Sequence, residues 1–183
     1  MYEPAELASF ALAEFERGLE NLTEEEAAQR VPKADGTLTN SISWIVAHVG
    51  VHWIQASRVP AGVELREDWT RFSSGPTAEP TPPSLSEALA VLHAAREIVR
   101  WTESADEGVL GMKHARPEWR GELTARRAEN VGTRLLRAVL HTWYHTGEVN
   151  MIRQLQGHPP INFVGTMIDH LEWRLEPEGV TAL

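Results

Sequence analysis

Two histidines one helical turn apart are the residues of this sequence that most directly suggest chemistry. His141 and His145 stand within the run LHTWYHTGE at 140–148, near the end of a predicted helix over 130–156. Residues four apart lie on one face of a helix, so both imidazoles can contact one metal ion. Two imidazoles do not fill a tetrahedral shell. The spacing therefore predicts part of a metal site, with at least one more ligand elsewhere in the fold.

The protease version of this motif is excluded. A helical zinc protease motif places glutamate directly after the first histidine, and here Thr142 follows His141. The alternative to a metal site is that both histidines are hydrogen-bonded residues of a helical core, since this spacing also arises by chance.

Four long amphipathic helices are predicted to position these residues. Apolar side chains recur every three to four positions over about 3–21, 40–57, 84–103 and 130–156. Shorter helical pieces are predicted at 23–29 and 162–174, and no alternating pattern indicates a strand. The predicted fold class is all-α, a four-helix bundle with one or two short extra helices in a single domain, 1–183.

Two connections in this bundle are long. The proline-rich connection 59–83 is predicted to wrap the surface or cover a pocket mouth, where it is a source of substrate contacts. The segment 104–129 is polar, is interrupted by glycine and proline, and is predicted to be mostly loop.

A second histidine pair lies in the helix predicted over 40–57. That segment is apolar around much of its circumference, which predicts burial, yet it contains His48 and His52. Bundles place metal sites between facing helices, so His48 is the candidate third ligand for His141 and His145. Three histidines leave a coordination position open, as in catalytic sites. His52, one turn from His48, is a rival or additional ligand, and the sequence does not choose between them.

The composition of the sequence limits the classes of partner that the protein is expected to bind. The formal net charge of −9 repels phosphate backbones and anionic lipid, so neither nucleic acid nor membrane is expected as a partner. The absence of cysteine excludes disulfides, thiolate metal ligands and a cysteine nucleophile. Together with the lack of a signal peptide or apolar span, it favours the cytoplasm.

The sequence resembles a known superfamily in four segments. These are GTLTNSISWIVAH at 36–48, NVG at 130–132, HTWYHTGE at 141–148 and LQGHP at 155–159. In this order they resemble the DinB-like superfamily, which includes the YfiT-type proteins and the bacillithiol- and mycothiol-dependent transferases. The resemblance covers roughly 3–160. It implies a four-helix bundle of DinB/YfiT type with His48, His141 and His145 as ligands of a divalent metal.

Two residues depart from the family pattern. Many members have glutamine where Glu148 stands here, which leaves Glu148 as a partner of a ligand, an occasional ligand or a proton acceptor. His52 lies outside the pattern, so a four-histidine cluster stays open. Activity varies within the superfamily, because one fold can carry several reactions.

The resemblance and the absence of cysteine together predict a mechanism. A divalent ion on neutral imidazoles favours the deprotonated form of a group in the open position. The expected nucleophile is a low-molecular-weight thiol, bacillithiol or mycothiol, that attacks an electrophile in stress response or detoxification. Zinc or nickel is the expected metal, although imidazole also suits iron and copper.

Two residues near the site have competing interpretations. Arg134 shares a face approximately with His141 and is a candidate for binding the thiol's carboxylate; the alternative is a surface salt bridge. Trp44, one turn before His48, either walls the pocket or belongs to the core.

Three functions remain open. The first is the metal-dependent thiol transferase. The second is a metal-dependent hydrolase in which the ion activates water and Glu148 or His52 acts as general base. The third is a non-enzymatic stress or ligand-binding bundle. A homodimer is expected in each case.

Overall fold

The computed structural model of the protein describes residues 4–74, 80–114, 129–165 and 167, and most of these residues lie in helices. The helices are α1 (Pro4–Arg17), α2 (Glu24–Ala28), α3 (Ile42–Ala61), α4 (Leu85–Thr102), α5 (Glu107–Gly111) and α7 (Val131–Leu155), with the 3-10 helix η1 (Glu67–Phe72). Two short strands, β1 (Lys113–His114) and β2 (Glu129–Asn130), pair in antiparallel fashion. The predicted all-α class is confirmed for the described residues.

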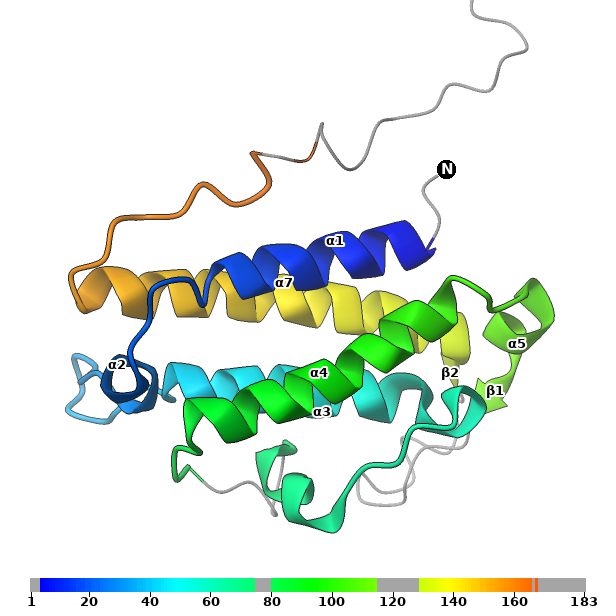
Figure 1. The fold of residues 1–183 in the computed structure, drawn as a ribbon, viewed down its shortest axis with the longest axis horizontal. Helices are drawn as coiled ribbons and strands as arrows, with labels where there is room; N and C mark the ends of the chain where they lie inside the picture. The colour runs from blue at the N-terminus through cyan, green and yellow to red at the C-terminus, as the bar shows by residue number, and fades with distance from the viewer. Residues whose placement is uncertain (1–3, 75–79, 115–128, 166, 168–183) are drawn as a thin grey trace, which may run out of the picture.

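The longest described helices pack as two neighbouring pairs. Helix α1 lies along α7, and α4 packs across α3 (Figure 1). The pairs also contact each other, because α3 packs on α7 and α1 packs on α4. As a result, the two helices that carry the four candidate histidines share a boundary inside the molecule.

Side-chain caps begin the histidine-bearing helices where the sequence predicts. The Ser41 hydroxyl accepts a hydrogen bond from the Trp44 backbone N–H at 3.1 Å, and the Asn130 side chain accepts one from the Thr133 N–H at 2.8 Å. These bonds satisfy N–H groups that have no partner within the first helical turn. Gly157, with φ +96°, follows α7 and adopts the left-handed backbone that commonly ends a helix.

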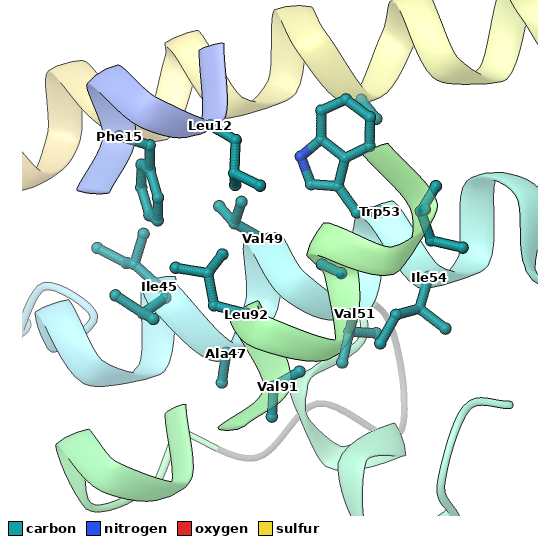
Figure 2. Close-up of a cluster of buried hydrophobic side chains, with 14 of the residues drawn as sticks. Leu12, Phe15, Ile45, Ala47, Val49, Val51, Trp53, Ile54, Val91 and Leu92 are labelled. Atoms are coloured by element: carbon teal, nitrogen blue, oxygen red, sulfur yellow. The ribbon is translucent and has the colours of Figure 1, made fainter. Parts of the chain in front are cut away.

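The hydrophobic core is packed between α1, α3, α4 and α7. Phe15, Trp53 and Leu92 are fully buried, and Figure 2 shows Leu12 and Phe15 of α1 beside the α3 side chains. Helix α3 is central to this core because apolar residues surround most of it.

A glycine allows the two central helices to approach closely. A Cβ atom built on Gly50 of α3 would lie 2.9 Å from the backbone of Val91 in α4, closer than real Cβ contacts. Any larger residue would push α3 and α4 apart, so Gly50 fixes the depth at which α3 sits in the core.

The structure differs from the predicted elements in the connections. Helix α3 continues to Ala61, beyond the predicted end at 57, and stops at Gly62, whose φ is +69°. The predicted connection 59–83 contains η1, which packs on α3. The predicted loop 104–129 contains α5 and part of the strand pair. The strands were not predicted because two residues are too few to show an alternating pattern.

Other predictions fall outside the described residues. Most of the helical piece predicted at 162–174 lies there, and 163–165 forms a turn. Among the described residues, none of the helices combines the length and apolar character needed to cross a membrane.

Candidate metal centre

A buried hydrogen bond aligns α3 with α7 beside the histidines. The indole N–H of Trp53 in α3 donates to the Thr142 hydroxyl of α7 at 2.9 Å, and Figure 2 shows this indole between the two helices. The Thr142 hydroxyl in turn donates to the Ala138 carbonyl at 2.8 Å. Trp53 and Thr142 each follow a histidine in sequence, His52 and His141, so this bond fixes the register in which the histidines meet.

Three histidine nitrogens converge between these helices. His141 Nε2 lies 3.3 Å from His48 Nε2 and 3.2 Å from His145 Nε2. Among the described residues these three form the group that can hold a metal ion, with ligand atoms all within 4.8 Å of one another. His48 and His145 are buried, whereas His141 is partly exposed. The structure thus brings together the three residues that the family resemblance implied as ligands.

Hydrogen bonds fix the orientation of two of these rings. His48 Nδ1 donates to the backbone carbonyl of Phe72 at 2.6 Å, and His145 Nδ1 donates to a Glu148 carboxylate oxygen at 2.7 Å. In the tautomer that these two bonds select, Nδ1 carries the proton and Nε2 presents its lone pair to the cluster. Partners of this kind commonly hold metal-binding histidines in the correct tautomer.

His141 is held in a different way. Its ring stacks on that of His52, with centroids 3.8 Å apart and an interplanar angle of 14°. The Nδ1 atoms of both rings are buried and have no hydrogen-bond partner among the described residues. His52 supports His141 through ring contact and does not belong to the converging group.

The surroundings keep these histidines neutral. Burial lowers the pKa of His48 to about 4, of His52 to about 3 and of His141 to about 2. For His141, the neighbouring rings of His52, His145 and His48 lower the pKa further, because adjacent imidazolium charges would repel. At neutral pH these rings therefore offer lone pairs, which is the form that binds metal.

The converging nitrogens fit a metal ion better than a hydrogen-bonded cluster. In a tetrahedral shell with metal–nitrogen bonds of about 2.0–2.1 Å, two ligand nitrogens stand about 3.3 Å apart. The distances from His141 Nε2 to the other two nitrogens are 3.3 and 3.2 Å. Without an ion, one proton on His141 Nε2 can satisfy only one of those two lone pairs. A cation satisfies all three.

The remaining predicted site residues lie around this centre. Trp44 is buried and its ring stacks on His48, with centroids 4.9 Å apart, so it is a core residue in contact with a ligand. Arg134 donates a hydrogen bond to the Gln55 backbone carbonyl of α3. Its candidate role as a thiol-binding residue remains a prediction. Glu148 contacts the site through the His145 ring.

One group that orients a candidate ligand was not predicted from the sequence. The carbonyl that accepts the His48 proton belongs to Phe72 in η1, within the connection expected to cover a pocket mouth. A backbone carbonyl leaves no residue signature, so no sequence signal could have found it.

The other described histidines lie apart from the centre. His93 is exposed on α4, and His158 contacts Glu26 at 3.2 Å. His114 lies in β1.

No model of a known protein family matches the sequence, and no curated protein matches it significantly.

Proposed function

We propose that this protein is a metal-dependent thiol transferase, in which a divalent ion held by His48, His141 and His145 activates a low-molecular-weight thiol. The observation that carries the proposal is the convergence of three Nε2 atoms, two of them on rings whose Nδ1 protons are already bound. A set of three neutral histidines leaves a position for an exogenous ligand, as catalytic sites do.

We propose further that α1, α3, α4 and α7 form a four-helix bundle of DinB/YfiT type. The cyclic contacts α1–α4, α4–α3, α3–α7 and α7–α1 support a bundle. The resemblance of the motifs supports the type, because two of the four segments that carry it, 36–48 and 141–148, include the candidate metal ligands of α3 and α7.

The bound ion would supply positive charge that stabilises a thiolate at neutral pH. The chain's own residues prepare this site. Phe72 and Glu148 hold two ligand rings in place, and burial keeps His48 and His141 neutral. Imidazole ligands bind a metal ion in their neutral form, so they would leave the positive charge of the ion undiminished. The Glu148 carboxylate would influence the ion only through the His145 ring.

The nucleophile is assigned to a small molecule because the 183 residues contain no cysteine. The thiol loses its proton, its sulfur forms a bond to the electrophile, and the leaving group departs with its electron pair. Bacillithiol or mycothiol is the proposed cosubstrate, with zinc or nickel as the proposed metal.

Hydrolysis receives less support from the geometry. A general base works best with a pKa near the operating pH, but the pKa of His52 is lowered to about 3 by burial. The other candidate, Glu148, already accepts the His145 proton. Neither residue is well suited to remove a proton from water.

The test is metal analysis together with a conjugation assay on protein without a histidine tag. We expect about one zinc or nickel ion per chain, and conjugation of monobromobimane that needs both the metal and an added thiol. His145→Ala should abolish stoichiometric metal binding and keep a helical circular dichroism spectrum. The matched control is His93→Ala, which removes an exposed histidine of α4.

Each alternative function predicts a different outcome of these measurements. Unchanged metal content in His145→Ala would remove the site assignment. Metal-dependent turnover with water alone would favour hydrolysis, and a fully stable untagged protein without metal would favour a non-enzymatic bundle.

A further inference from the structure

The outer face of α7 carries an exposed apolar stripe. Five large apolar side chains are half or more exposed: Leu136 at 51%, Leu140 at 64%, Tyr144 at 70%, Met151 at 50% and Leu155 at 61%. The other exposed positions between Leu136 and Leu155 are Arg137, Gly147 and Gln154. A solvated helix face is normally polar, so this stripe, which the described residues leave exposed, is a candidate contact surface.

The order of residues along the stripe is symmetric. The exposed positions are 136, 137, 140, 144, 147, 151, 154 and 155, and each position has a counterpart equally far from the midpoint between 145 and 146. A two-fold axis that pairs two antiparallel copies of α7 at this midpoint therefore matches every exposed position with another.

The residue types match as well as the positions. In this pairing, Leu140 would face Met151 of the second copy, and Leu136 would face Leu155. The polar positions Arg137 and Gln154 would face each other. At the centre, the largest side chain, Tyr144, would face the smallest residue, Gly147. A ring placed over a glycine lets two helices approach closely, as a knob does in a hole.

No contact among the described residues accounts for a glycine at position 147. A Cβ at this position would meet nothing within 4 Å, and the backbone does not require positive φ. Glycine inside a helix destabilises it relative to alanine, so a residue with no intramolecular role suggests an intermolecular one. The space above Gly147 is the space that a partner's Tyr144 would fill.

The size of the stripe suits a dimer. Five such side chains expose apolar surface on the order of 500 Å², at the upper end for one patch on a monomer. Two copies together would bury about 1,000 Å² before the polar rim is counted, which reaches the lower limit for specific interfaces.

We propose that the outer face of α7 is the interface of an antiparallel homodimer, with Tyr144 of each protomer packed over Gly147 of the other. The interface adjoins the metal centre, because the Tyr144 ring contacts His145 edge to face with centroids 4.9 Å apart. The proposal does not depend on the function of that centre.

The first test measures association by sedimentation equilibrium. The full chain should be dimeric, and Gly147→Leu should weaken the dimer by at least about thirtyfold, the effect of losing one central interface contact. Leu140→Lys and Met151→Glu should each do the same. An equimolar mixture of these two variants should recover the dimer, because the introduced lysine of one chain then faces the introduced glutamate of the other. The matched control is Leu38→Lys, at a 43% exposed leucine outside the stripe.

The second test uses the absence of native cysteine to read the register. Leu140→Cys and Met151→Cys chains, mixed and oxidised with diamide, should form a covalent dimer. Leu140→Cys alone should not, because its two copies would stand 11 residues apart along the antiparallel pair, about 16 Å.

Three results would overturn the proposal. These are a monomeric wild-type chain at concentrations up to hundreds of micromolar, a dimer that Gly147→Leu and Leu140→Lys leave intact, and cross-linking of Leu140→Cys with itself but not with Met151→Cys. Circular dichroism of each variant verifies folding, which the exposed positions of the substitutions should preserve.

Discussion

The indole of Trp53 is hydrogen-bonded to the hydroxyl of Thr142 across the boundary between α3 and α7, at 2.9 Å. Both groups are buried, and each residue adjoins a histidine of the candidate metal centre. The bond therefore couples the packing of the two helices to the geometry of the site. A change in this core contact should be detectable at the metal.

Thr142→Val tests that coupling. Valine has a similar shape but leaves the buried Trp53 N–H without an acceptor, so the free energy of unfolding should fall by about 1–3 kcal/mol. Thr142→Ser, which keeps the hydroxyl, should lose less. Urea unfolding measures both variants, and metal titration should show weaker binding in the valine variant. Equal stability of the two variants would contradict the role given to the hydroxyl.

Glu148 is expected to strengthen metal binding by holding His145. Glu148→Ala removes the acceptor of the Nδ1 proton and should lower metal affinity by about 10–100-fold. Glu148→Gln keeps a carbonyl acceptor without the charge and should fall between the wild type and the alanine variant. Competition with a chromogenic chelator measures the three affinities. If the Glu148→Gln and Glu148→Ala variants bind metal as tightly as the wild type does, Glu148 has no positioning role.

His52 is expected to act through its ring and not as a ligand. His52→Phe preserves an aromatic surface against His141 and should keep about one metal ion per chain. His52→Ala removes the stack, and its affinity should fall while the stoichiometry remains. Elemental analysis and titration distinguish the two effects. A loss of stoichiometric metal in His52→Phe would instead favour a four-histidine site.

The metal-free protein should lose stability as the pH falls below about 6.5. The pKa values of His48, His52 and His141 are lower in the folded protein than the ordinary value of 6.5, so the unfolded chain binds more protons in this range. Between pH 6.5 and 5 the loss is up to about 2 kcal/mol for His48 alone. Urea unfolding of metal-stripped protein at both pH values measures it.

The contribution of the carboxylates to stability can be distinguished from that of the histidines because it changes at lower pH. The pKa values of Glu26, Asp35 and Asp68 are lowered by hydrogen bonds from ordinary values of 4.5 and 3.8, so their stabilisation is lost only at lower pH. Removing one titrating ring, as in His52→Phe, should make the loss between pH 6.5 and 5 smaller. A stability that stays constant across this range would contradict burial of neutral histidines.

The local features of this protein were determined by the sequence. The apolar period of the segments that became α3, α4 and α7 predicted helices, and Asn130 marked the start of one because its side chain caps free N–H groups. The four-residue spacing of His141 and His145 placed both on one face. These are short-range relations, so a linear pattern can carry them.

The partners across the fold were decided by tertiary structure. The carbonyl of Phe72 that orients His48, the stacking of His52 on His141 and the bond from Trp53 to Thr142 join residues far apart in the chain. They depend on how deeply α3 packs and on its register against α7, which the sequence does not display. The sequence thus supplied three histidines and left His52 and Glu148 unassigned. The packing of α3 against α7 placed the His52 ring on His141, whereas Glu148 contacts His145 within α7 itself, three residues further along.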